Sequence, residues 1–149
     1  MIVVDASVAA KLVLTDEAHA DKAASLARDS ASRGEPLVAP PLLPTELTNI
    51  LRQRMRRVGM PLETARQLLA DFLALSITLT APADLYDRAL QLAVQYNLPA
   101  AYDAHYLALA QLLGCDLWTD DQRLINALAG NPPFVQWIGA YQQQQGPQP

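Results

Sequence analysis

The sequence predicts an α/β domain in which a mostly parallel sheet carries helices on both faces. Apolar runs that are too short for helices alternate with longer segments whose apolar residues recur at helical spacing. This alternation is typical of a parallel sheet, because each parallel strand needs a crossover connection, usually a helix. The chain has 149 residues, of which 51% are hydrophobic, so it can bury a core as one domain. We expect that domain to span residues 1–141, and the Gln- and Pro-rich tail at 142–149 to be disordered.

The first half of the chain predicts two strands and two helices. The apolar run at residues 2–4 shows no polar alternation, as in a strand that is buried on both faces. Alanines at helical spacing predict a helix across residues 16–33, and a second short strand follows at 37–39. Thr45 is expected to cap the next helix, which runs toward Gly59.

The second half continues the same alternation, with turn residues between the elements. Apolar periodicity predicts helices over residues 61–74, 82–95, 103–113 and 121–129. Strands are predicted over residues 76–80, 115–118 and 134–137. Gly114 is expected to close one of these helices, since a glycine after the last helical residue readily adopts the left-handed conformation.

Composition excludes several classes of protein. A single cysteine, Cys115, with only His19 and His105 as histidines, allows neither a disulfide framework nor a zinc-finger site. Lys and Arg number 11 against 15 Asp and Glu, which disfavours binding to nucleic acid through bulk charge alone. The sequence shows neither a membrane-spanning stretch nor a secretory signal, so we expect a cytoplasmic protein without membrane contact.

Several carboxylates are predicted near one edge of the sheet, beyond the carboxyl ends of the strands, where open parallel sheets bind ligands. Asp5 follows the first strand, and Asp120 and Asp121 follow the fourth. Glu46 and Asp103 lie near the starts of two helices. Each could simply cap a helix by accepting backbone N–H bonds. Converging carboxylates, however, repel one another unless a cation neutralises them, and oxygen-only ligands favour Mg²⁺ or Mn²⁺.

Four segments of the sequence resemble PIN-domain proteins, and most closely the VapC-type ribonuclease toxins of bacterial toxin–antitoxin modules. The segments are Val4-Asp5-Ala6-Ser7-Val8-Ala9-Ala10-Lys11, Pro44-Thr45-Glu46-Leu47, Tyr102-Asp103-Ala104-His105-Tyr106-Leu107-Ala108-Leu109-Ala110 and Leu117-Trp118-Thr119-Asp120-Asp121-Gln122-Arg123-Leu124. They follow one another in the family's order, and the resemblance covers nearly the whole chain. It implies a PIN-like three-layer sandwich whose five-stranded sheet has the order 3-2-1-4-5.

The resemblance also implies the chemistry of the site. Asp5, Glu46, Asp103 and Asp121 would form an acidic quartet that holds Mg²⁺ or Mn²⁺, with Asp5 and Asp103 as the core ligands. The metal would activate a water molecule that hydrolyses RNA, so no Ser, His or Cys nucleophile is needed. The expected partners are an RNA substrate, a cognate antitoxin protein and a second copy of the chain in a homodimer.

Three further residues have supporting roles by the same resemblance. Ser7 matches a small hydroxyl residue that assists through water, and Thr119 matches the hydroxyl of a Thr-x-Asp segment. Asp120 is the alternative to Asp121, because neighbouring side chains on an extended segment point to opposite sides and only one can face the crevice. The spacing from Thr119 favours Asp121.

Two features of the predicted helices, a basic run and the apolar faces, can each be interpreted in two ways. The one dense basic run of the sequence consists of Arg52, Arg54, Arg56 and Arg57. It is either a solvated helix face or a surface that grips RNA phosphates. The apolar faces of the helices over residues 45–59 and 61–74 either pack in the core or bind a second copy or an antitoxin helix.

The sequence therefore predicts a metal-dependent endoribonuclease that is the toxin of a toxin–antitoxin pair. One alternative is a PIN nuclease that serves RNA processing without an antitoxin; an adjacent small reading frame for an antitoxin would separate the two. The other alternative is a non-catalytic, acidic α/β protein-binding module, which would show no Mn²⁺ uptake that depends on Asp5 and Asp103.

Overall fold

The computed structural model describes residues 1–130 and 132–142 of the chain. Its sheet has the strand order β3-β2-β1-β4-β5, and each neighbouring pair is parallel. The strands are β1 (Ile2–Val4), β2 (Leu37–Ala39), β3 (Ile77–Leu79), β4 (Leu117–Thr119) and β5 (Val135–Trp137). The predicted fold class and the strand order implied by the resemblance are confirmed. Because the order reverses between β1 and β4, a ligand crevice is expected beyond the carboxyl ends of these two strands.

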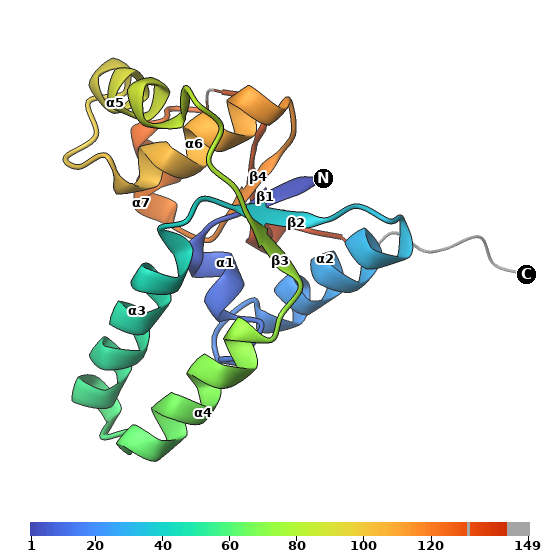
Figure 1. Cartoon of the computed structure of the whole chain (residues 1–149), viewed down its shortest axis with the longest axis vertical. Helices are drawn as coiled ribbons and strands as arrows, with labels where there is room; N and C mark the ends of the chain where they lie inside the picture. The colour runs from blue at the N-terminus through green and yellow to red at the C-terminus, as the bar shows by residue number, and fades with distance from the viewer. Residues whose placement is uncertain (131, 143–149) are drawn as a thin grey trace, which may run out of the picture.

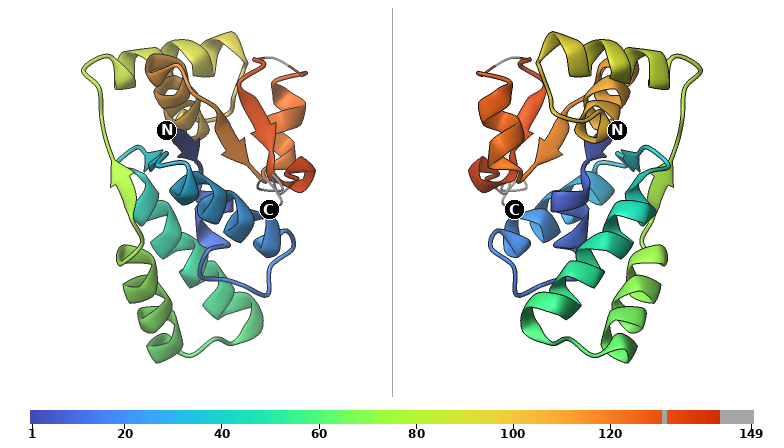
Figure 2. Two further views of the ribbon diagram at one scale, coloured as in Figure 1. Left: turned by 90° about the vertical axis from the view of Figure 1, so that its right-hand side faces the viewer. Right: turned by 90° about the vertical axis from the view of Figure 1, so that its left-hand side faces the viewer.

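Helices flank the sheet on both sides (Figures 1 and 2). They are α1 (Ala6–Ala10), α2 (Ala20–Ser32), α3 (Leu43–Val58), α4 (Leu62–Leu73), α5 (Leu85–Gln95), α6 (Tyr102–Leu113) and α7 (Gln122–Ala127), with a short 3₁₀ helix at Ile138–Ala140. Figure 1 shows α1 and α2 on one side of the sheet, α5 and α6 on the other, and α3 and α4 as a helical hairpin that projects from the domain. None of the described helices has the length and apolar character needed to cross a membrane.

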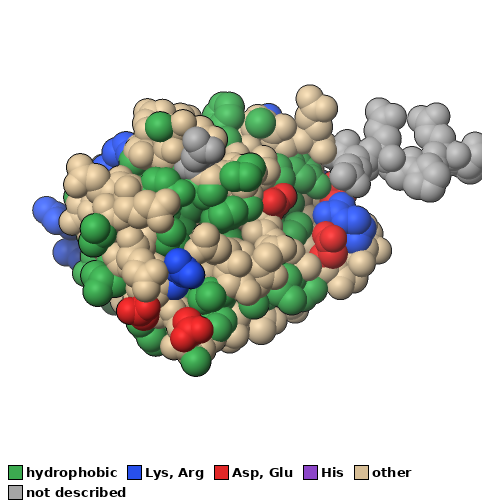
Figure 3. All heavy atoms as spheres, turned by 90° about the horizontal axis from the view of Figure 1, so that it is seen from above, with side chains coloured by type: hydrophobic (Ala, Val, Ile, Leu, Met, Phe, Trp, Pro, Cys, Tyr) green, Lys and Arg blue, Asp and Glu red, His purple; other side chains and the backbone are tan. Residues whose placement is uncertain are grey.

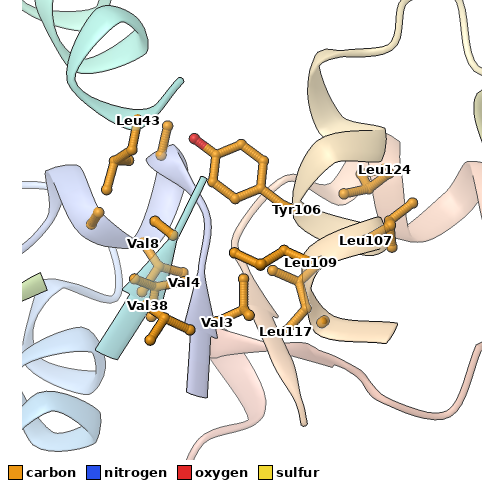
Figure 4. Close-up of a cluster of buried hydrophobic side chains, with 14 of the residues drawn as sticks. Val3, Val4, Val8, Val38, Leu43, Tyr106, Leu107, Leu109, Leu117 and Leu124 are labelled. Atoms are coloured by element: carbon orange, nitrogen blue, oxygen red, sulfur yellow. The ribbon is translucent and has the colours of Figure 1, made fainter. Parts of the chain in front are cut away.

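Strand β1 lies at the centre of the sheet and of the hydrophobic core. All three of its residues are buried, as the unalternated apolar run predicted. Figure 4 shows Val4 on the side of Val8 from α1, and Val3 on the side of Leu109 from α6. Because close-packed neighbours hold this strand on both faces, the residue that follows it, Asp5, has a fixed position.

The start of the chain departs from the prediction in two places. The helix α1 was not predicted, because it has only five residues and the apolar run continues into it without a break. The helix predicted from residue 16 begins only at Ala20, after turns between α1 and α2. His19 precedes it with φ of 62°, in the left-handed region, and a helix cannot pass through such a residue.

Several other element boundaries were also predicted wrongly. The helix predicted over residues 82–95 is α5 and begins only at Leu85, and the helix predicted over 121–129 is α7 and ends at Ala127. Thr45 does not cap α3, which begins at Leu43 with Pro44 in its first turn, where the fixed φ of proline suits a helix. Strand β4 begins at Leu117, two residues later than predicted. Residues 114 and 115 instead close α6: Gly114 is left-handed as predicted, and the Cys115 N–H donates to the carbonyl of Ala110.

The apolar faces of α3 and α4 pack mostly into the domain. Leu47, Leu51 and Phe72 are buried, and Ile50, Leu68 and Leu69 pack half-buried against the core. The core-packing interpretation is therefore correct for these residues. Apolar side chains that stay exposed on this hairpin are Val58, Leu62 and Leu73.

The predicted tail falls almost entirely outside the part of the chain that the structure describes. Gln142 is exposed, and residues 143–149 lie beyond the described residues. The boundary at residue 141 and the disorder of the tail therefore stay predictions.

Candidate active site

A pocket of about 550 Å³ opens at the carboxyl edge of β1 and β4. Its lining includes four of the carboxylates that the sequence singled out: Asp5, Glu46, Asp103 and Asp121. They come from the end of β1, the first turn of α3, the first turn of α6 and the segment after β4. The fold thus brings together residues that lie far apart in the sequence. We call this feature the acidic pocket.

Asp5 is the most deeply buried of the four, with 5% of its surface exposed. Its Oδ1 accepts a hydrogen bond from the Val8 N–H at 3.0 Å, which caps α1, and another from the Ser7 hydroxyl at 2.6 Å. Burial raises the pKa of Asp5 to about 6, although hydrogen bonds from Ser7, Thr119 and Val8 oppose the shift. The carboxylate is therefore held firmly in an environment that disfavours its charge.

Glu46 is half-buried and points to a neighbour from another helix. The Tyr106 hydroxyl on α6 donates a hydrogen bond to its Oε2. Burial raises the pKa of Glu46, the bond from Tyr106 lowers it, and the charge of Asp103 raises it. Burial also raises the pKa of Tyr106 far above its usual range, and the charge of Glu46 adds to the shift, so its hydroxyl stays a donor.

Asp103 and Asp121 both line the pocket, but they differ in how far helix capping accounts for them. Asp121 caps α7, accepting from the N–H groups of Arg123 at 2.9 Å and Leu124 at 3.3 Å. The N-cap residue of α6 is Ala101, which has no capping side chain, and Asp103 lies two residues further along, in the first turn. Burial raises the pKa of Asp103, and the charge of Asp121 raises it further. Helix capping thus explains Asp121 and Asp5 in part, but it does not explain Asp103.

Little positive charge offsets these carboxylates. Across residues 1–130 and 132–142, no Lys, Arg or His forms an ion pair with Asp5, Glu46 or Asp103. Arg123 lines the pocket with its Nε 3.6 Å from Asp121 Oδ1, but its side chain is 95% exposed. Within the same described ranges, no three His, Cys, Asp or Glu side chains converge tightly enough to grip one metal ion. The pocket gathers the carboxylates without packing them into a closed cage.

Asp120 lies next to Asp121 but outside the acidic pocket. It accepts from the Trp137 indole N–H at 2.9 Å and approaches His19 Nδ1 at 3.0 Å. The Lys11 ammonium is 3.0 Å from its Oδ2, and Lys11 is itself buried. Burial alone would raise the pKa of Asp120, but the hydrogen bonds from Lys11, His19 and Trp137 lower it overall. We call Asp120, Lys11, His19 and Trp137 the Asp120 network.

The two hydroxyl residues of the expected site connect these two regions. Ser7 donates to Asp5 and accepts from the Asp120 N–H at 2.7 Å. Thr119 is fully buried, and its Oγ1 accepts from the Asp121 N–H at 3.0 Å. Both hydroxyls therefore fix the backbone that aims Asp120 and Asp121 in different directions.

The four arginines of α3 divide by their tertiary partners. Arg54 is half-buried and pairs with Asp16 and with Glu17, the latter at 2.8 Å. Arg52 and Arg56 are exposed. Arg57 is exposed as well, but it lines a second pocket that adjoins the first.

Some pocket residues were missed by sequence reasoning. Tyr106 and Asn49 line the pocket, but the sequence-based prediction gives neither of them a role in the site. Both lie three residues after a predicted site carboxylate, Asp103 and Glu46 respectively, and residues at that spacing share a helix face. That spacing is the signal that would have found them.

Comparisons with known proteins identify a matching family and similar proteins. The model of the PIN domain family matches residues 2–130. The "VapC ribonuclease Mb0985" of Mycobacterium bovis is 34% identical over 124 residues, covering 83% of this chain and 88% of that protein. "Ribonuclease VapC12" of Mycobacterium tuberculosis is 33% identical over 131 residues, covering 88% and 95%. The crystal structure of Mycobacterium tuberculosis VapC20, titled a "Sarcin-Ricin loop cleaving toxin", has the same fold, with a TM-score of 0.61 at 23% identity over 85% of this chain and 95% of that one.

Proposed function

The chain belongs to the PIN-domain family, with VapC ribonucleases as relatives, and we propose that it is an endoribonuclease toxin that hydrolyses RNA with a divalent cation bound in the acidic pocket. The observation that carries this proposal is the gathering of four carboxylates in one pocket. Three of them form no ion pair within the described part of the chain. Such a pocket attracts a cation from solution.

The donor set fits a hydrated Mg²⁺ or Mn²⁺. Carboxylate oxygens are the ligands that these ions prefer, and Mg²⁺ usually takes one or two of them while it keeps several waters. Coordination by one or two carboxylates and several waters is compatible with a pocket in which, among the described residues, no three ligating side chains converge. We assign Asp5 and Asp103 as the direct ligands, with Glu46 and Asp121 binding the ion's waters.

The side chains of the pocket have separate tasks in this proposal. The ion, when bound, would supply a water of lowered pKa and offset the charge of the scissile phosphate. Asp5 is oriented for its task by Ser7 and the Val8 N–H, which occupy its Oδ1. Glu46 is oriented by the Tyr106 hydroxyl. Because water is the nucleophile, no covalent intermediate forms on the protein.

Metal uptake tests the proposal directly. We expect Mn²⁺ to bind the wild-type protein, as followed by electron paramagnetic resonance of free Mn²⁺, and to bind Asp5→Asn and Asp103→Asn far more weakly. Asp116→Asn is the matched control, since Asp116 is an exposed carboxylate just before β4, at the opposite edge of the sheet. Equal Mn²⁺ uptake by Asp103→Asn and Asp116→Asn would contradict the assignment and favour a binding module. Cleavage of a labelled RNA by the wild-type protein completes the test.

We also propose that a cognate antitoxin and a second copy of the chain bind this protein. Exposed apolar side chains support such contacts: Leu62 and Leu73 on α4, and Tyr86, Leu90 and Val94 on α5. The face of the molecule seen in Figure 3 carries hydrophobic side chains scattered among polar side chains and backbone atoms, with few charged groups. Size-exclusion chromatography with light scattering tests the homodimer, and a monomeric mass at working concentration contradicts it.

The antitoxin is expected to dock an apolar helix on the apolar side chains that stay exposed on α3 and α4, which are Val58, Leu62 and Leu73. It is also expected to bring an Arg or Lys toward Asp5, Glu46 and Asp103. A guanidinium can take the place of the metal charge in a carboxylate pocket through bidentate contacts. Charge reversal of that antitoxin residue should then restore cleavage of a labelled RNA while the apolar docking still gives measurable binding. Retained inhibition by the reversed antitoxin would show that the pocket is blocked sterically instead.

A further inference from the structure

A second pocket of about 370 Å³ continues from the acidic pocket along α3. The two pockets share Ser7, Asn49 and Ile50 in their linings, so they adjoin one another. The second pocket runs between α1 and α3, which lie side by side in both views of the domain (Figures 1 and 2). We call this continuation the α3 groove.

One face of α3 supplies the α3 groove with a graded series of side chains. Glu46 lines the acidic pocket, Asn49 lines both pockets, and Gln53 and Arg57 line the α3 groove. Successive members are three or four residues apart, which places them about 4.5 to 6 Å apart along the helix axis. The face therefore passes from a carboxylate through two amides to a guanidinium.

The remaining charges of the α3 groove are already neutralised within the protein. Lys11 pairs with Asp120 at 3.0 Å and lies 3.8 Å from Glu17. Glu17 also pairs with Arg54 at 2.8 Å. Arg57 forms no ion pair with any residue in the described ranges. The α3 groove thus offers an external ligand one unpaired positive charge, at the end remote from the acidic pocket.

We infer that the α3 groove is a subsite for the single-stranded RNA that flanks the scissile phosphate, with Asn49 and Gln53 facing the nucleotide and Arg57 binding a phosphate. This inference rests on the proposed function. An endonuclease cleaves within a strand, so the substrate must leave the acidic pocket along the protein surface. Amide side chains both donate and accept hydrogen bonds, as base edges and ribose hydroxyls require, and these groups are accessible in single-stranded RNA.

Of the four arginines of the basic run, the α3 groove includes Arg57 alone. Arg52, Arg54 and Arg56 belong to the same basic run, but none of them lines either pocket, and Arg54 already pairs with Asp16 and Glu17. A surface that bound RNA through general positive charge would use Arg56 as much as Arg57. The subsite predicts that only Arg57 contributes.

The test compares Arg57→Ala with its neighbour Arg56→Ala, an exposed arginine on the same helix. Binding of a fluorescein-labelled single-stranded RNA is measured by anisotropy in EDTA, over a series of salt concentrations. We expect Arg57→Ala to weaken binding by about five- to tenfold and to reduce the slope of log K against log salt by about 0.7, the value for one phosphate contact on a single strand. Arg56→Ala should leave the RNA affinity and the salt slope close to the wild-type values. Gln53→Ala should weaken binding without changing the slope, because it is neutral.

Steady-state cleavage and Mn²⁺ uptake separate the possible failures. In the subsite model, Arg57→Ala raises KM for RNA, keeps kcat, and binds Mn²⁺ like the wild type. If Arg57→Ala and Arg56→Ala behave alike, the α3 groove is not the RNA subsite, even though metal binding and cleavage survive. That result would also be obtained if the α3 groove holds an antitoxin peptide instead of RNA. If the wild-type protein neither binds Mn²⁺ nor cleaves RNA, the proposed function fails and the subsite fails with it.

Discussion

Asp120 and Asp121 are neighbours in the sequence, yet they belong to two regions with opposite electrostatics. In the Asp120 network, the carboxylate has Lys11, His19 and Trp137 as partners, and its pKa lies below the usual range despite burial. In the acidic pocket, the pKa of Asp5 and of Asp103 is raised, mainly by burial. Neither of these two forms an ion pair within the described part of the chain.

We propose that this difference separates a carboxylate with a structural role, Asp120, from carboxylates that bind a ligand. The protein satisfies Asp120 with its own groups, so that residue stabilises the fold by tying α1 and the start of α2 to the sheet edge. The acidic pocket keeps carboxylates whose charge the protein itself does not balance, which costs stability unless a ligand provides the balance. Variants that remove either the carboxylate charge of the acidic pocket or the partner of a neutralised charge test this comparison.

The largest effect is expected for the direct ligands. Asp5→Asn and Asp103→Asn keep the shape of the side chain but lose the charge that binds the cation, so RNA cleavage and toxicity in cells should fall at least about a thousandfold. The control Asp116→Asn should stay within about twofold of wild type, since it changes an exposed group away from the pocket. Circular dichroism confirms folding of each variant. Full activity in either purified pocket variant would contradict the assignment.

A smaller effect on cleavage, but a large difference between two adjacent residues, is expected at Asp120 and Asp121. Asp121→Asn should reduce cleavage by about a hundredfold, because Asp121 lines the pocket. Asp120→Asn should reduce it far less, because Asp120 faces the Asp120 network. Both variants are compared under identical metal concentrations with one labelled RNA. An inactive Asp120→Asn beside an active Asp121→Asn would place the functional residue one position earlier.

Stability should respond in the opposite sense in the two regions. Among the described residues, Asp120→Asn leaves the buried Lys11 ammonium with Glu17 at 3.8 Å as its one remaining acidic partner, so we expect a loss of about 2–4 kcal/mol in the free energy of unfolding. Asp5→Asn removes a buried charge, so in EDTA at pH 8 we expect a gain of about 1–3 kcal/mol. Urea denaturation measures both values.

The gain from Asp5→Asn should depend on pH in a defined direction. The pKa of Asp5 is about 6 in the folded protein, against an ordinary value of 3.8. A raised folded-state pKa gives stability that is fully present below pH 3.8 and is lost as the pH rises through about 6. The variant should therefore exceed the wild type above pH 6 and match it near pH 4. An equal gain at both pH values would show that packing, not charge, causes it.

Most of the fold was predictable because its signals are local. The unalternated run of β1 predicts a strand buried on both faces, and Gly114 predicts the end of α6. The start of α2 was not predictable, because it follows His19, a non-glycine residue in the left-handed conformation whose ring contacts Asp120, a residue far away in the sequence. The helix α1 was missed for another reason: it is too short to show a period of its own.

Site residues could be predicted where the strand order determines their position. They could not be predicted where their role depends on side-chain contacts that only the folded chain makes. Asp5 and Asp121 follow strands that end at one edge of the sheet, so their proximity follows from the fold class. Sequence alone cannot distinguish Arg54 from Arg57, because only the folded chain brings Asp16 and Glu17 to the former. Tyr106 was missed for a similar reason: its ring belongs to the buried face of α6, and only its hydroxyl reaches the acidic pocket.

The smallest effect is expected at Tyr106, whose hydroxyl donates to Glu46. Tyr106→Phe keeps the buried ring, which is 1% exposed, so the stability should change little. It removes a hydrogen bond to a carboxylate, worth about 1.5–3 kcal/mol where water cannot replace it; since the pocket is open to water, we expect about a tenfold loss of kcat. Tyr102→Phe is the control, because Tyr102 lines the same pocket but is 62% exposed. If both variants cleave RNA like the wild type, Glu46 is positioned by its helix alone and Tyr106 serves only the core.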